Sequence, residues 1–241
     1  MIEKNSSELF LKTITKDKRT LEMFRFLVNN SMIRVINYHN TDAINSERFE
    51  TEIKYFSENF HPVTIEDLDN FFKTKKWPFT KPGCIPAIFE GYRSHIDTYA
   101  KILDKYNFVG WFYIPSFFMD IPAKDQIDFC HNHRLRISTV HGYEDGRVAM
   151  NEEEIKKLSE KHVICCHTGT HYELKPNATE EELRHEIVDA KRKLEQVTGK
   201  SCDVFCWLAG EDYAHSAWAH KYLEEAGYKY VVSNLKIEKI K

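Results

Sequence analysis

Residues 162–208 read "HVICCHTGTHYELKPNATEEELRHEIVDAKRKLEQVTGKSCDVFCWL" and contain a complete strand–helix–strand unit. A β-branched, cysteine-rich run ends at Cys166. Thr179 and Glu182 then have the spacing of a capping box, and the helix that they begin ends at Gly199. A second β-type run follows at 202–208. Because the crossover contains a helix, the two strands are expected to lie parallel in one sheet.

The same alternation recurs along the chain. Further β-type runs lie at 33–39, 84–90, 108–114, 135–141 and 228–233, and helical patterns separate them. Seven such runs favour one closed α/β barrel. An open doubly wound sheet is the alternative, although no glycine-rich phosphate loop follows any strand. We expect residues 1–31 to form a helical extension packed on a barrel domain that spans 32–241.

Composition excludes several classes of protein. The chain has 241 residues and 42% hydrophobic content, enough for one sizeable core. A net charge of −3 without a long Lys/Arg run argues against a nucleic-acid-binding protein. No run approaches the roughly 20 apolar residues of a membrane span. The N-terminal stretch lacks the continuous apolar segment of a secretory signal.

The six cysteines are expected to be reduced thiols. Cys202 and Cys206 lie roughly 13 Å apart along a strand, at ~3.3 Å per residue. A disulfide needs Cα atoms within about 7 Å. No C-x-x-C pair is present. Together with the missing secretory signal, this predicts a cytoplasmic protein.

Five side chains that suit metal binding or proton transfer fall at the ends of predicted strands: His39, Glu90, His141, His167 and His171. Functional groups of parallel barrels gather at these ends. Imidazole and carboxylate groups also suit zinc and similar divalent ions. The two histidines of "HTGTH" either face one ion from a tight loop or are ordinary polar loop residues, and their spacing alone leaves both interpretations open.

The order of these motifs resembles the NodB-type polysaccharide deacetylases. Residues 150–233 have that family's capped helix, strand, H-[ST]-x-x-H, long helix and "AGYKY" strand. Earlier, "VINYHN" at 35–40, "VTIEDLDNFF" at 63–72 and "IFEGYRS" at 88–94 resemble its first strand, following helix and T-F-D-D-G-Y-[RK]-S element. The likeness covers residues 32–234, most of the chain.

This resemblance implies a distorted (β/α)7 TIM-like barrel with a divalent ion, usually zinc, held by one Asp and two His. It implies hydrolysis of an N-acetyl group on an amino sugar, either a small molecule or an oligosaccharide, with an aspartate as base and a late histidine as acid. On this chain, Glu90 takes the position of the metal-binding aspartate, and His167 and His171 are the other two ligands.

The chain departs from the family pattern at the groups that move protons. Phe89 stands where the base is expected. In the third motif, Cys206 replaces an arginine and Leu208 a proline. We also expect no counterpart of the late acid histidine after "YKYVVS". The candidate substitutes for acid and base are His39, His141, Glu211 and Asp212.

Whether the protein is an enzyme is therefore left open by the sequence. One hypothesis is a metal-dependent deacetylase with altered acid and base groups, acting on a cytoplasmic precursor of a surface polysaccharide. The alternative is a catalytically inactive relative that binds a carbohydrate or a protein partner. A third hypothesis is a hydrolase of another amide or imide. The sequence predicts that standard N-acetylated chito-oligosaccharides are deacetylated very slowly or not at all.

Overall fold

The computed structural model describes residues 33–39, 46–137, 143–210, 217–234 and 236–240. The extension predicted at 1–31 lies outside these residues, so the predicted domain division stays a prediction. In the described part of the chain, no helix has the length and apolar character needed to cross a membrane.

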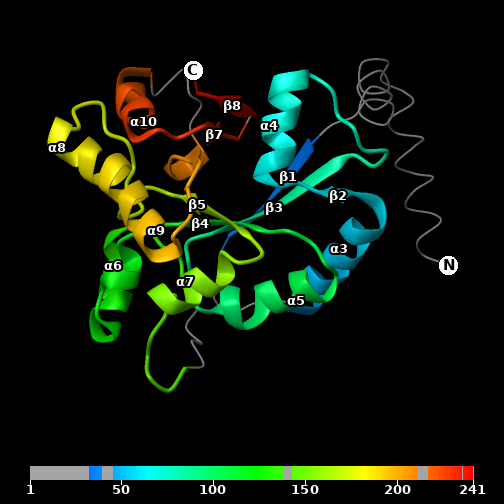
Figure 1. Cartoon of the computed structure of the whole chain (residues 1–241). Helices are drawn as coiled ribbons and strands as arrows, with labels where there is room; N and C mark the ends of the chain where they lie inside the picture. The colour runs from blue at the N-terminus through cyan, green and yellow to red at the C-terminus, as the bar shows by residue number, and fades with distance from the viewer. Residues whose placement is uncertain (1–32, 40–45, 138–142, 211–216, 235, 241) are drawn as a thin grey trace, which may run out of the picture.

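One curved sheet runs through the molecule, with helices around it (Figure 1). Its parallel strands are, in spatial order, β1 (Ile33–Tyr38), β3 (Gly83–Phe89), β4 (Trp111–Ile114), β5 (Val163–Cys166), β6 (Val204–Phe205) and β7 (Tyr230–Val232). Two short strands extend it: β2 (His61–Pro62) pairs in parallel with β3, and β8 (Ile237–Lys239) pairs antiparallel to β7. The central strands β3 to β7 are almost completely buried because helices cover the sheet, as in other parallel sheets, whereas β1, β2 and β8 at its margins are partly exposed.

The helices connect successive strands. They are α3 (Ser46–Asn59), α4 (Ile65–Thr74), α5 (Ala100–Lys105), α6 (Gln126–Asn132), α7 (Glu152–Leu158), α8 (Glu180–Leu183), α9 (Ala190–Thr198) and α10 (His220–Ala226). The predicted capping boxes at Thr64, Asn151 and Thr179 are all present. A π-helical segment, η4 (Arg184–Asp189), joins α8 to α9, and the long helix ends at Gly199 with a left-handed φ of 68°.

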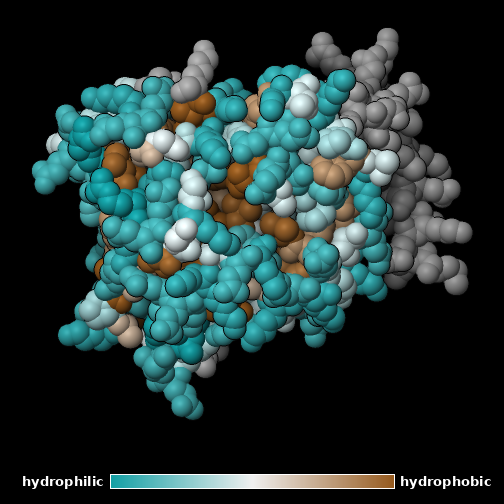
Figure 2. All heavy atoms as spheres, viewed as in Figure 1, coloured by the Kyte–Doolittle hydropathy of each residue, from teal (hydrophilic) through white to brown (hydrophobic). Residues whose placement is uncertain are grey.

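Apolar side chains fill the space between sheet and helices. The largest fully buried side chains include Trp111, Trp207, Tyr92 and Tyr113. Hydrophilic side chains cover most of the face seen in Figure 2, and hydrophobic atoms show only in gaps between them. The buried side chains of Phe89 and Cys206 belong both to this core and to the wall of one pocket, so that pocket borders a close-packed interior.

The predicted fold class is confirmed, with two differences in detail. Among the described residues, the sheet is an open half-barrel, because no pairing joins β1 to β8. The strand predicted at 135–141 is wrong over 135–137, and 138–142 lie outside the described residues. No strand is needed there, because β4 pairs directly with β5. Leu135 is instead held by its backbone N–H, which donates to Cys130 O at 2.9 Å.

Candidate active site

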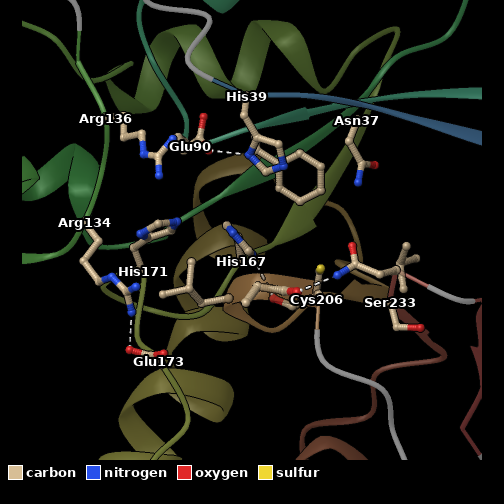
Figure 3. A pocket seen from close by; sticks show the side chains of 16 residues that line it. Asn37, His39, Glu90, Arg134, Arg136, His167, His171, Glu173, Cys206 and Ser233 are labelled. Carbon is tan, nitrogen blue, oxygen red and sulfur yellow. Dashed lines mark hydrogen bonds and ion pairs between the residues drawn. The ribbon is translucent and has the colours of Figure 1, made fainter.

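A pocket of about 430 Å³ opens at the carboxyl ends of the parallel strands. Its walls come from segments that follow six different strands, which places residues far apart in sequence around one space (Figure 3). The predicted site residues that line it are His39, Phe89, Glu90, His167, His171, Cys206 and Leu208. This is the position at which parallel α/β barrels carry their functional groups.

The two histidines of the "HTGTH" loop are held by backbone carbonyls. Nδ1 of His167 lies 2.9 Å from Cys206 O, and Nδ1 of His171 lies 2.6 Å from His133 O. A carbonyl oxygen only accepts, so each Nδ1 carries the proton and each Nε2 keeps a lone pair. The two ring centroids are 5.0 Å apart. A histidine that binds a metal usually donates its other ring N–H to such an acceptor, which fixes the orientation of the ring.

Burial keeps both imidazoles neutral near pH 7. It lowers the pKa of His167 well below its ordinary value, and the neighbouring His171 lowers that pKa further. Burial also lowers the pKa of His171, although the bond to His133 and the charge of Glu90 oppose the shift. Neutral imidazole is the form that binds a divalent ion.

The loop between the histidines is fixed by a buried carboxylate on the long helix. Glu186 is only 4% exposed, and its Oε2 accepts from the backbone N–H groups of Gly169 and Thr170, each at 2.8 Å. Its Oε1 accepts from the Thr170 hydroxyl at 2.8 Å. Thr168 and His171 both have a left-handed φ, of 65° and 60°. These three bonds stabilise a turn whose left-handed backbone angles are energetically unfavourable for residues other than glycine.

Gly169 is required by its surroundings rather than by its dihedral angles. A Cβ at this position would lie 2.7 Å from the Phe117 ring and 3.1 Å from Glu186 Oε2. The Phe117 N–H also donates to Gly169 O at 2.9 Å. The close approach of these groups leaves room only for hydrogen.

Glu90 forms a short hydrogen bond with His39 in the same pocket. His39 Nδ1 lies 2.6 Å from Glu90 Oε1, and the Glu90 side chain is nearly buried. Glu90 has a left-handed φ of 86°, and its N–H donates to Tyr113 O at 3.0 Å. The carboxylate accepts from the Nδ1–H of His39, so Nε2 is the ring nitrogen that this bond does not use.

Phe89 forms the floor beneath this pair. The ring of Phe89 stacks on His39 at 4.4 Å and on Tyr113 at 4.5 Å, and it meets His167 edge-on at 5.1 Å. The residue that replaces the expected base is therefore a packed aromatic side chain, which holds the His39 ring in place and offers no proton acceptor.

The fit of a metal ion depends on these three predicted ligands. Glu90, His167 and His171 line one pocket, and the histidine pair has the tautomers that a ligand needs. Across the described residues, however, no group of three or more His, Cys, Asp or Glu side chains is placed to hold an ion. The histidines fit a divalent ion, whereas the carboxylate of Glu90 is turned to His39. The metal triad stays a prediction.

The remaining predicted residues divide into two groups. Cys206 lies in the pocket wall, where burial raises the pKa of its thiol to about 12, so it supplies neither a cation nor a thiolate. All six cysteines are buried free thiols. His141, Glu211 and Asp212 lie outside the described residues, and their predicted roles stay untested.

Sequence reasoning missed several residues that matter to the pocket. One wall of the pocket is lined by Arg134, Arg136 and Glu173, and other parts of the pocket are lined by Asn37 and Asn234. The alternating pattern of 134–137 was the available signal, but it is equally typical of a half-buried strand. Glu186 could have been found from its place three residues after Leu183 and four before Ala190, on the buried face of a helix.

The comparisons with known proteins agree with this fold. IcaB from Ammonifex degensii has 15% sequence identity and a TM-score of 0.64, over 84% of this chain and 83% of that chain. The Streptococcus pyogenes deacetylase PplD, in complex with acetate, has 13% identity and a TM-score of 0.62, over 86% and 84%. A de-N-acetylase from Aggregatibacter actinomycetemcomitans has 14% identity and a TM-score of 0.61, over 88% and 90%.

Sequence comparison gives the family. Among curated proteins, no sequence matches the chain. The family model described as "Polysaccharide deacetylase" matches residues 90–231, a span that begins at Glu90 and includes both loop histidines. Because this match extends over more than half of its length, the chain belongs to the polysaccharide deacetylase family.

Proposed function

We propose that the protein hydrolyses the N-acetyl group of an amino sugar, with a divalent ion, zinc in the first instance, held by Glu90, His167 and His171. The observation that carries this proposal is the buried histidine pair. Both rings are neutral, both are fixed through Nδ1, and both line the pocket that contains Glu90.

A bound ion would polarise the amide carbonyl and lower the pKa of water. The chain's own residues supply the proton transfer. Glu90 fixes His39 with Nε2 available to the pocket, so we assign His39 as the proton acceptor for the attacking water. Phe89 holds the His39 ring by stacking. The carbonyls of Cys206 and His133 hold the ligand histidines.

A catalytically inactive carbohydrate-binding relative is the second candidate, and Phe89 favours it. The ring is 4% exposed and packed between His39 and Tyr113. A carboxylate base cannot enter that place without repacking. Loss of a general base commonly reduces rates by about 10²–10⁴-fold.

The experiment is acetate release from N-acetylated amino sugars by the purified full chain supplemented with zinc. We expect slow release that His167→Ala abolishes and that His39→Gln reduces by about 10²-fold or more. His131→Ala removes an exposed histidine from α6 and serves as the matched control. No release from any N-acetylated sugar, together with retained sugar binding, would favour the inactive relative.

We also propose that the protein works in the cytoplasm, on an amino-sugar precursor of a surface polysaccharide. The six buried free thiols support a reducing compartment. Fractionation of cells that express the native protein would test this, and recovery of the protein outside the cytoplasm would contradict it.

A further inference from the structure

Two arginines on one short segment face the candidate active site. Arg134 and Arg136 both line the pocket, and the residue between them, Leu135, is buried at 3% exposure. Both guanidinium groups lie on the pocket side of the segment, whereas Leu135 packs into the core. Figure 3 shows them on the wall that also carries His171 and Glu173.

This segment is anchored at three successive points. The carbonyl of His133 accepts from His171 Nδ1 at 2.6 Å. The N–H of Leu135 donates to Cys130 O at 2.9 Å. The carbonyl of Arg136 accepts at 2.7 Å from the hydroxyl of Tyr92, whose side chain is fully buried. These bonds hold the backbone that presents the arginines, and one of them comes from a predicted metal ligand.

Only one of the two arginines has an acidic partner among the described residues. Glu90 pairs with His39, and Glu173 pairs with Arg134. In the described part of the chain, no acidic side chain pairs with Arg136. In this ion pair the Arg134 side chain is 67% exposed and the Glu173 side chain is 56% exposed. Because exposed ion pairs contribute little free energy, a ligand anion could replace Glu173 at little cost.

We propose that Arg134 and Arg136 form an anion subsite, so that the amino sugar bound in this pocket carries a phosphate or a carboxylate. The planar guanidinium group binds both anions through two parallel hydrogen bonds that the negative charge strengthens, and a neutral sugar has no such charge. This inference rests on the proposed function for the sugar, and the arginine segment identifies the class of substrate.

The test is calorimetric binding to the full chain, freed of metal on a chelating resin so that an anion cannot bind an ion instead. The probes are N-acetylglucosamine, N-acetylglucosamine 1-phosphate and N-acetylmuramic acid. We expect at least one anionic sugar to bind about tenfold or more tightly than the neutral sugar. Hydrogen bonds to charged groups contribute enough for about a 10- to 100-fold preference.

Variants assign the effect to the segment. Arg136→Gln should weaken binding of the anionic sugar by about 10-fold or more and leave the neutral sugar unchanged, and Arg136→Lys should restore part of the loss. Arg48→Gln removes an equal charge from the exposed face of α3 and should change nothing.

Three results would overturn the proposal. They are equal or undetectable binding of all three sugars, a preference that survives in the Arg134→Gln/Arg136→Gln double variant, and inorganic phosphate that binds as tightly as the sugar phosphate. The proposed deacetylase activity is tested separately, by measuring acetate release. Release from an anionic sugar that Arg136→Gln does not change would retain the deacetylase and reject the subsite.

Discussion

Removal of the Glu186 carboxylate tests how the histidine loop is held. In Glu186→Ala, the N–H groups of Gly169 and Thr170 lose their acceptor, and the Thr170 hydroxyl loses its own. A buried polar group left without a partner costs about 1–3 kcal/mol. Two such N–H groups predict a loss of about 2–6 kcal/mol in the free energy of unfolding, with the lower end reached if water enters the space.

Urea denaturation followed by circular dichroism measures this loss. Glu186→Gln keeps an amide oxygen for the two N–H groups, and its NH₂ group can donate to the Thr170 hydroxyl. We therefore expect it to lose less than about half of what the alanine variant loses. Glu181→Ala, exposed on the same helix, controls for the change in helix propensity. An alanine variant within about 1 kcal/mol of the wild-type protein would show that Glu186 does not hold the loop.

Three further predictions concern packing and protonation. Gly169→Ala should destabilise the protein by about 1–3 kcal/mol, because the new Cβ meets the Phe117 ring at 2.7 Å, and a crystal structure of the variant should show that ring displaced. Burial lowers the pKa of His95 to about 3 and that of His162 to about 4. As the pH falls, the unfolded chain binds these protons before the folded chain does, because its histidines have the ordinary pKa of about 6.5. The contribution of each neutral histidine to the free energy of unfolding is therefore complete above about pH 6.5 and decreases below it, by about 2 kcal/mol each at pH 5. Urea titrations between pH 7.5 and 5 should show this fall, and His162→Gln should reduce its slope. Phe89→Asp should fail to raise acetate release and should cost about 3–5 kcal/mol of stability, because it removes the packed ring; strong activation would contradict the account of the pocket floor.

Local signals made the helices predictable. The capping boxes at Thr64, Asn151 and Thr179 depend on side chains three residues apart, so the sequence contains them in full. The position of the pocket histidines was also predictable, because the functional groups of parallel α/β barrels lie at the carboxyl ends of the strands.

The segment at 134–137 was not predictable, because its conformation depends on distant partners. Its alternation suits a strand, yet Arg134 has a left-handed φ of 59°. The hydroxyl of Tyr92, 44 residues away, holds the backbone of Arg136. The pairing of Glu90 with His39 also joins residues 51 positions apart, and no spacing rule contains it.

Zinc titration of the metal-free chain by calorimetry, with the stoichiometry confirmed by elemental analysis, tests directly whether the three predicted ligands bind an ion. We expect one ion per chain in the wild-type protein, and a loss of about tenfold or more in affinity in each of Glu90→Gln, His167→Ala and His171→Ala. The control His131→Ala should bind as the wild-type protein does. Zinc binding that survives in both His167→Ala and His171→Ala, or no binding by the wild-type chain, would contradict the assignment of these side chains as ligands.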